Sequence, residues 1–257
     1  MDRKAVKISF VNLSKSFFQK TRKETVEIKV VDDISLDVYD NEFLVILGPG
    51  RCGKTVLLNM IAGLEIPSCG SICLDGEEIV GNDRRISMVF QKWSLLPWKT
   101  VIQNVEIGPK FRGVDKRSRR EKAQKNLDLV GLQGFENAYP SQLSGGMKQR
   151  VGIARAYTND PEVLLMDEPF GALDAQTRLS MEQEIERIWN VQKRTIVFVT
   201  NNIDEAVYLG DRIVLLSQCP GKIKKIYENI LPRPRDIVSK DFLRFREEIF
   251  QNSDLVL

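Results

Sequence analysis

The chain of 257 residues contains no histidine. It therefore lacks the most common general base of enzymes, the serine–histidine–aspartate triad and every imidazole ligand for a metal. It has only four cysteines, and because no two of them form a CxxC pair, an ordinary zinc site cannot be assembled and reduced thiols are expected. Any chemistry must rely on carboxylates, lysine, backbone amides and an external metal ion.

Long apolar runs are also missing. No stretch approaches the roughly 18 to 20 residues that cross a bilayer, and the start, MDRKAVKISF, lacks the apolar core of a signal peptide. We therefore expect a cytoplasmic protein that is associated with a membrane only through a partner. No sign of charge dominates either: 38 basic and 35 acidic residues give a net charge of +3, which is too balanced to indicate nucleic acid binding.

The apolar pattern predicts an α/β fold. With 42% hydrophobic residues the chain can bury a sizeable core. Residues 5–47 alternate like β-strands, residues 93–160 are mainly helical, and strands alternate with helices after residue 160. This order predicts a mostly parallel sheet with an N-terminal β subdomain and an inserted helical subdomain. The expected parts of this single domain are a core with the β subdomain at 1–92 and 161–232, a helical subdomain at 93–160 and a tail with a terminal helix at 233–257.

A glycine-rich segment, GPGRCGKT at 48–55, fits the pattern GxxxxGK[ST] and lies between an apolar strand and a helical pattern. Glycines let backbone N–H groups turn toward phosphate oxygens, and the positive end of the following helix points at the same anion. Lys54 can reach the β- and γ-phosphates, and the Thr55 hydroxyl can bind Mg²⁺. We interpret this segment as a phosphate-binding loop.

A second motif, VLLMDE at 163–168, places two carboxylates at the end of a buried strand. In open α/β sheets, ligands bind at the C-terminal edge of the strands. Asp167 can hold Mg²⁺ through water, and Glu168 can polarise the water that attacks the γ-phosphate. The pair therefore predicts a metal and catalytic site.

A third motif, LSGGMKQR at 143–150, lies at the start of a predicted helix between the other two. With these three motifs the chain resembles the ATP-binding subunits of ABC transporters over essentially its whole length. The resemblance implies a P-loop NTPase (RecA-like) core whose β subdomain is antiparallel. It also implies MgATP hydrolysis at the cytoplasmic face of the membrane. In the family, the surface formed by Ser144, Gly145 and Gly146 closes over ATP held by a second subunit in a head-to-tail dimer.

The resemblance also assigns roles to single residues. Phe17 resembles the aromatic residue that stacks on adenine, with Phe18 as the alternative, and Gln91 resembles the glutamine that links Mg²⁺ to the helical subdomain. The nucleotide-binding residues are then Phe17, Gly48, Gly50, Arg51, Cys52, Gly53, Lys54, Thr55, Val56, Ser144, Gly145 and Gly146. The catalytic residues are Lys54, Gln91, Glu168 and Asn201, and the metal-binding residues are Thr55, Gln91 and Asp167.

Within the family, segments such as DEPFGALDAQTR and LPRPRD look most like the nitrate, sulfonate and taurine importers. This likeness suggests a small anionic solute that passes through a separate membrane permease and is delivered by a solute-binding protein. The stretch Trp93–Trp98 follows Gln91 and carries two tryptophans, which either line a groove for the permease or belong to the core.

The chain departs from the family pattern at Asn201, where the motif VTHDxxEA has its switch histidine. An asparagine amide can donate a hydrogen bond but is never positively charged. Losing a charge-stabilising or acid–base group typically costs about 10²- to 10⁴-fold in rate. Two hypotheses stay open: an importer ATPase with a lowered rate, or an ATP-binding regulatory half of a heterodimer. A third, a soluble ABC ATPase acting on ribosomes or DNA, would need a second cassette or a long coiled coil, and neither is present.

The phosphate loop departs from the pattern as well. Gly50 and Arg51 stand where the family commonly has a serine or asparagine and then a glycine, and Val56 replaces a hydroxyl residue. If position 51 requires a positive φ, Arg51 is strained by about 1 kcal/mol or more, unless Gly50 takes up the bend. The Arg51 guanidinium then either approaches the phosphates or the opposing subunit, or lies in solvent without a role.

Overall fold

The computed structural model describes residues 5–20 and 24–255. It separates into two compact units, which are described in turn. The first unit consists of Met1–Asp83 together with Thr195–Leu257, and the second is Arg84–Arg194. Among the described residues, no helix combines the length and the apolar character needed to span a membrane.

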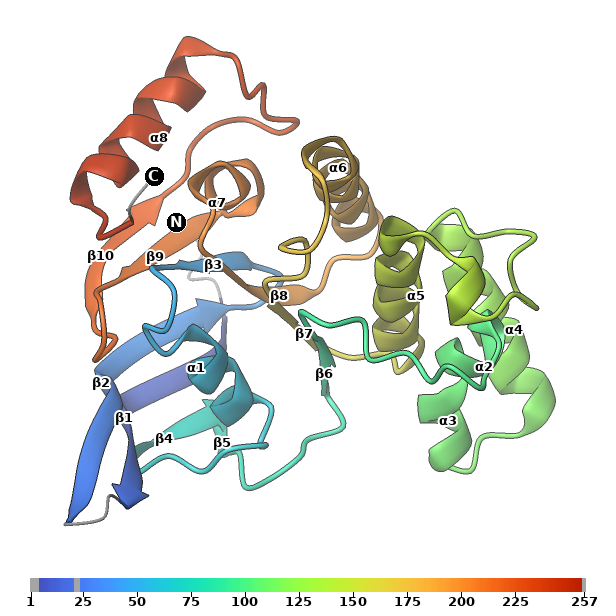
Figure 1. The fold of residues 1–257 in the computed structure, drawn as a ribbon, viewed down its shortest axis with the longest axis horizontal. Coiled ribbons are helices and arrows are strands. Elements are labelled where there is room, and N and C mark those ends of the chain that lie inside the picture. The colour runs from blue at the N-terminus through green and yellow to red at the C-terminus, as the bar shows by residue number, and fades with distance from the viewer. Residues whose placement is uncertain (1–4, 21–23, 256–257) are drawn as a thin grey trace. The chain divides into compact units, whose positions relative to one another are not determined.

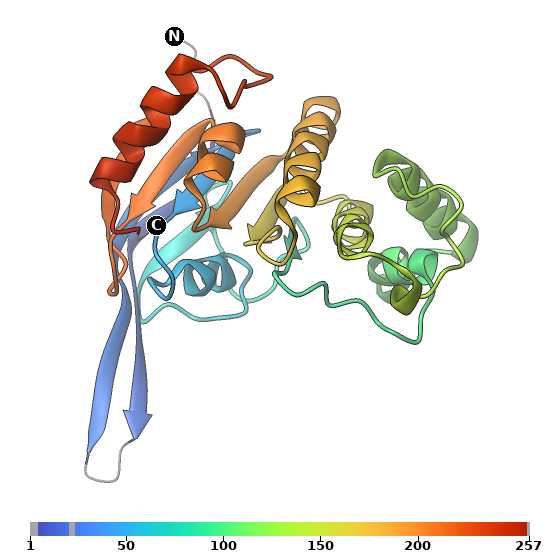
Figure 2. The same ribbon diagram turned by 45° about the horizontal axis from the view of Figure 1, so that its top comes forward.

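The N-terminal part of the first unit is an antiparallel sheet, as predicted. Strand β1 (Val6–Lys20) pairs with β2 (Thr25–Tyr39) on one side and with β4 (Cys69–Leu74) on the other, and β4 pairs with the short β5 (Glu77–Glu78). The pairing of β1 with β4 ends at Ser14, so the far ends of β1 and β2 continue as a two-stranded ribbon beyond the sheet (Figure 2).

The second sheet of this unit has the order β10 (Ile223–Glu228), β9 (Arg212–Leu216), β3 (Phe43–Leu47), β8 (Thr195–Thr200). Strand β3 runs parallel to both β8 and β9, whereas β10 is antiparallel. All residues of β3 and β8 are buried, which explains why these strands have continuous apolar sequences instead of alternating ones. The loops that follow β3, β8 and β9 therefore leave the sheet at one edge.

Three helices accompany this sheet (Figure 1). They are α1 (Lys54–Ile61), α7 (Ile203–Leu209) and the terminal helix α8 (Lys240–Asn252). Helix α7 packs on β3, and α8 packs on α7. Helix α8 begins at the cap Ser239, whose hydroxyl accepts a hydrogen bond from a backbone N–H, and buries two apolar side chains that lie seven residues apart on one face.

The second unit combines two parallel strands with a group of helices. Its strands are β6 (Ile86–Val89) and β7 (Val163–Asp167), which pair in parallel from Ile86 opposite Val163 to Val89 opposite Met166. Its helices are α2 (Val101–Val105), α3 (Ile107–Phe111), α4 (Lys116–Leu129), α5 (Gly145–Thr158) and α6 (Ala175–Val191), with a single 3₁₀ turn, η1 (Pro140–Gln142), before α5. Helix α5 packs on α2, α4, α6 and β6 and so forms the centre of the unit.

Helix α4 begins where the sequence predicts, because the carboxylate of Asp115 accepts a hydrogen bond from the Ser118 N–H (3.0 Å). The second unit also contains β6, β7 and α6, because α5 packs on β6 and α6 as well as on the other helices. It is therefore larger than the helical subdomain expected at 93–160, and the predicted subdomain boundaries stay a prediction.

Candidate nucleotide-binding site

The predicted phosphate loop connects β3 directly to α1. The Lys54 ammonium folds back over the loop and donates to the carbonyl oxygens of Gly48 (2.9 Å) and Pro49 (2.8 Å), and only 4% of Lys54 is exposed. Gly53 has φ 99°, and a Cβ at this position would lie 2.8 Å from the Val30 carbonyl oxygen. Position 53 therefore needs glycine both for its conformation and for the close approach of β2.

The loop carries a non-glycine residue in the left-handed region, Arg51, with φ 64°. Gly50 does not take a positive φ, so the bend falls on Arg51, at a cost of about 1 kcal/mol or more. The Arg51 side chain is exposed, while Cys52 beside it is only 1% exposed, and this burial raises the pKa of the Cys52 thiol. Backbone strain of this kind is typical of functional loops.

Asn201 follows β8 and is exposed. Because β8 and β3 are parallel neighbours, with Leu47 opposite Thr200, Asn201 emerges at the same edge as the phosphate loop. The next residue, Asn202, caps α7 by accepting hydrogen bonds from the N–H groups of Asp204 (2.8 Å) and Glu205 (3.3 Å). The switch position is thus fixed to the start of a helix.

In the second unit, β7 ends at Asp167, which is buried, and continues into Glu168. Glu168 has φ 41°, so its backbone is also in the left-handed region. Gln91 follows the parallel neighbour β6, and its Nε2 donates to Glu168 Oε2 at 3.3 Å. The structure thus places two of the predicted catalytic residues, Gln91 and Glu168, in contact with each other.

The LSGG segment forms the N-terminus of α5. The Ser144 hydroxyl accepts a hydrogen bond from the Met147 N–H (3.3 Å), and the helix starts at Gly145. A Cβ on Gly146 would lie 2.8 Å from Thr177 Cγ2 in the first turn of α6, so this glycine lets the two helix starts approach closely. The 14-residue helix presents free N–H groups and its positive end, as a second anion-binding surface requires.

The predicted adenine-stacking residue, Phe17, lies on the two-stranded ribbon opposite Ile28 and is 38% exposed. The Lys15 ammonium lies 4.9 Å from the centre of its ring. Phe18, the alternative, is opposite Glu27 and 71% exposed. Successive strand residues point to opposite faces, so only one of the two phenylalanines can face a given ligand. The stacking role of Phe17 stays a prediction.

A cavity of about 650 Å³ opens beside the phosphate loop in the first unit. Its lining residues are Pro49, Gly50, Arg51, Asn201, Gln218, Cys219, Asp254 and Leu255. The first four belong to segments that the sequence singled out. The other four were missed, although the parallel pairing of β3 with β9 places the loop after β9 at this edge. The pattern RIVLLS could have indicated that loop, whereas nothing in the sequence indicates that residues 254–255 return to the cavity.

The family model for ABC transporters matches residues 31–171 of this chain. The chain belongs to this family. It is 51% identical to an uncharacterized ABC transporter ATP-binding protein of Methanocaldococcus jannaschii, over 96% of this chain and 91% of that protein. It is 42% identical to the aliphatic sulfonates import ATP-binding protein SsuB of Bacillus cereus, over 95% of this chain and 94% of that protein.

A solved bacterial ABC transporter cassette, determined as a dimer, superposes with a TM-score of 0.74 at 32% identity and covers 86% of this chain and 98% of its own. The same cassette has also been solved as a dimer in a post-hydrolysis state bound to ADP and Pi. These findings confirm the predicted fold, a P-loop NTPase, and the predicted class of protein, an ABC-type ATPase. The role of each site residue in this chain stays a prediction.

Proposed function

We propose that this chain is the ATP-hydrolysing subunit of an ABC importer, which binds MgATP in a dimer and drives a separate membrane permease from its cytoplasmic face. The observation that carries this proposal is the folded phosphate loop, in which the Lys54 ammonium already lies against the Gly48 and Pro49 carbonyls. A triphosphate would offer this cation stronger acceptors, since charge-assisted hydrogen bonds are roughly twice as strong as neutral ones.

The predicted metal ligands fit Mg²⁺. Thr55 offers a hydroxyl, Gln91 an amide oxygen and Asp167 a carboxylate, and oxygen donors are those that Mg²⁺ prefers. In residues 5–20 and 24–255 no group of three or more Cys, Asp or Glu side chains could hold a metal by itself, and this suits a cation bound mainly by phosphates and water. When bound, Mg²⁺ neutralises charge on the β- and γ-phosphate oxygens.

Glu168 would orient and polarise the attacking water. The water oxygen forms a bond to the γ-phosphorus while the bond to the bridging oxygen breaks, and the electron pair of that bond leaves with ADP. The proton of the water passes through the Glu168 carboxylate to the released phosphate. The hydrogen bond that Gln91 Nε2 donates to Glu168 Oε2 would help to hold this carboxylate in position.

A second copy of the chain, or a related subunit, would complete each site. The N-terminus of α5, with Ser144, Gly145 and Gly146, offers backbone N–H groups and no acidic residue in its first turn, so it suits a γ-phosphate held by the opposing phosphate loop. The dimeric state of the related solved cassette supports this arrangement.

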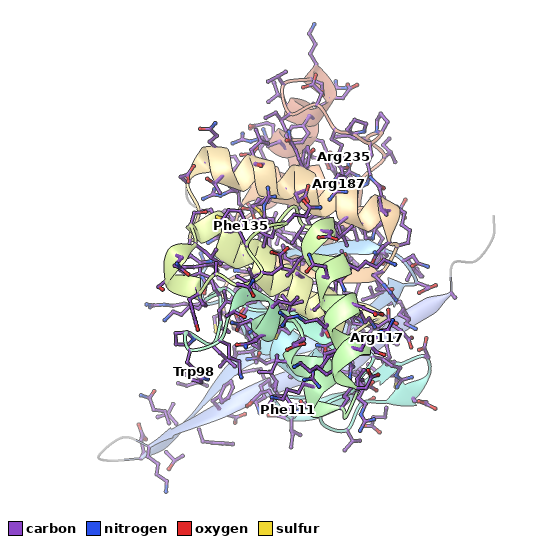
Figure 3. All side chains as sticks on the ribbon, turned by 90° about the vertical axis from the view of Figure 1, so that its right-hand side faces the viewer. Trp98, Phe111, Arg117, Phe135, Arg187 and Arg235 are labelled. Carbon is purple, nitrogen blue, oxygen red and sulfur yellow. The ribbon has the colours of Figure 1, made fainter. Side chains whose placement is uncertain are left out.

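The permease would contact exposed aromatic side chains of the second unit. Trp98 is 70% exposed and Phe111 is 83% exposed, and Figure 3 shows both on the face turned toward the viewer. Exposed aromatic side chains on a water-soluble domain favour a docking surface over core packing. Trp93 is only half-buried, with the Lys148 ammonium 4.8 Å from its ring centre. We propose an apolar helix of the permease as the partner.

The solute would be a small anion, with an organic sulfonate as the first candidate, delivered by a solute-binding protein. This proposal is supported by the relatives named as sulfonate import proteins and by the likeness of segments such as LPRPRD. Transport assays with the co-expressed permease test it: uptake of a labelled alkanesulfonate is expected, and uptake of an uncharged sugar in its place would contradict it.

One alternative keeps a specific observation in its favour. Asn201 replaces the switch histidine and lines the cavity beside the phosphate loop, so the chain could bind ATP as a regulatory half while a related subunit hydrolyses it. Steady-state ATPase activity of the purified chain separates the two functions. We expect turnover that falls at least about 10²-fold in Glu168→Gln, which should still bind ATP. ATP binding without turnover in the unaltered chain would favour the regulatory role.

A further inference from the structure

The two departures from the family pattern, Arg51 and Asn201, meet at one place in the fold. They lie far apart in the sequence, but both line the cavity of about 650 Å³ beside the phosphate loop. They meet because β3 and β8 are parallel neighbours: Arg51 lies in the loop after β3, and Asn201 follows β8. The two departures from the family pattern therefore belong to one surface of the first unit.

The side chains of Arg51 and Asn201 are not held by contacts to polar groups of the described residues. Within residues 5–20 and 24–255, the Arg51 guanidinium has no hydrogen bond or ion pair, and the same is true of the Asn201 amide. By contrast, Lys54 is bonded to two loop carbonyls. Arg51 is also held in a left-handed conformation that glycine would adopt at lower cost.

The charges around the cavity favour an anion in front of Arg51. Arg51 is the only cation among the described residues that line the cavity. The one lining carboxylate, Asp254, is already bound to the Lys224 ammonium (2.9 Å) and the Gln218 N–H (3.1 Å), and these hydrogen bonds lower the pKa of its carboxyl group. Asp254 therefore stays ionised but is largely neutralised, and the Arg51 charge is uncompensated.

We infer that Arg51 supplies in this chain the positive charge that Asn201 cannot, by donating hydrogen bonds to the γ-phosphate of bound ATP. A guanidinium is always charged and presents a planar fork of donors that matches phosphate oxygens, whereas the Asn201 amide is neutral. Arg51 gives up no proton; it stabilises the charge that spreads over the γ-phosphate oxygens during transfer to water. This inference rests on the proposed MgATP hydrolysis.

The test compares the full chain with Arg51→Gly, Arg51→Lys, Asn201→His and the double variant Arg51→Gly/Asn201→His. For each we would measure kcat, and separately the dissociation constants of MgATP and MgADP by displacement of a fluorescent nucleotide. We expect Arg51→Gly to lower kcat about 10²-fold or more and to weaken MgATP binding about tenfold, with MgADP changed by less than about twofold, because ADP has no γ-phosphate. Arg51→Lys should fall between.

The Asn201→His variant tests whether Arg51 takes over the role of a charged group at position 201. In the Asn201→His background, the loss of kcat on adding Arg51→Gly should shrink from about 10²-fold to less than about tenfold, because a second group then serves the same phosphate. An equal loss in both backgrounds, unchanged kcat in Arg51→Gly, or equal weakening of MgATP and MgADP would overturn the inference. Equal weakening together with lost dimerisation would place Arg51 against the opposing subunit.

The two proposals can fail separately. If the unaltered chain binds MgATP but does not hydrolyse it, the proposed function fails, and the comparison of MgATP with MgADP still decides the role of Arg51. If the chain hydrolyses ATP and Arg51→Gly binds both nucleotides as before, the inference fails and the proposed function stands.

Discussion

A side chain at Gly48 should destabilise the protein, although the φ of Gly48 lies outside the left-handed region that favours glycine. A Cβ at this position would lie 2.8 Å from Cys52 Sγ and 3.2 Å from Leu216 Cβ. Both neighbours are buried: Leu216 Cβ is fixed to the backbone, and Cys52 Sγ can turn about only one bond, within surroundings that leave Cys52 1% exposed. Over-packing of a close-packed site costs about 1–3 kcal/mol, so we expect Gly48→Ala to lower the free energy of unfolding by that amount.

The structure also says which neighbour causes the loss. Cys52→Ala removes the sulfur at 2.8 Å and leaves Leu216 Cβ at 3.2 Å as the nearest atom. Alone it should cost about 1 kcal/mol, through lost burial of the sulfur and a small cavity. The double variant Gly48→Ala/Cys52→Ala should then be more stable than the sum of the two single losses by about 1 kcal/mol or more.

Gly50→Ala is the matched control, since a Cβ at Gly50 meets nothing within 4 Å and its φ is not positive. It should change stability by less than about 0.5 kcal/mol. Urea unfolding of the four variants, followed by circular dichroism, measures these differences. The reasoning is refuted if Gly48→Ala is as stable as Gly50→Ala, or if the losses from Gly48→Ala and Cys52→Ala simply add.

Three further predictions concern single contacts. The free energy of unfolding should be about 1 kcal/mol higher for Arg51→Gly than for Arg51→Ala. Both variants remove the guanidinium, but only glycine relieves the strain of φ 64°. Equal stability of the two variants in urea would contradict this. The exposed pair of Asp204 and Arg246 (2.6 Å) should contribute less than about 1 kcal/mol, so a double-mutant cycle of Asp204→Asn and Arg246→Gln in thermal unfolding should give a coupling below that value, and a larger coupling would contradict it. Iodoacetamide at pH 8 should alkylate the exposed Cys219 well before Cys52, whose burial raises its thiol pKa, and the Cys52 rate should climb as the pH rises; equal rates by mass spectrometry would count against it.

The sequence was most informative where burial leaves a continuous pattern. Strands β3 and β7 are buried along their whole length, so their apolar runs stand out from the flanking residues, and the functional residues follow directly at their ends. The apolar pattern alone is therefore enough to place the glycine loop and the DE pair at strand ends. The N-terminal antiparallel sheet is predictable for a related reason, since its strands alternate between apolar and polar residues.

Side-chain contacts between segments that are distant in the chain could not be predicted from the sequence. The sequence does not show which of two adjacent residues, Gly50 or Arg51, has the positive φ that the loop requires. In the structure it is Arg51. The return of Asp254 to the phosphate loop depends on the packing of α8 on α7, which an amphipathic pattern alone does not direct to any one partner. The contact of Gly48 with Cys52 likewise arises only when the loop closes on itself.

Substitutions at motif positions are easier to interpret once the fold shows which of them are neighbours. Considered alone, Asn201 suggests an impaired ATPase and Arg51 suggests tolerated drift in a loop. In the fold they follow parallel neighbouring strands and line one cavity, in which Arg51 is the cation among the described lining residues. The Arg51 guanidinium brings to this cavity a permanently charged donor, which the neutral Asn201 amide does not offer. The charge of Arg51, and its place beside Asn201, are therefore the structural reason to expect turnover in this chain in spite of Asn201.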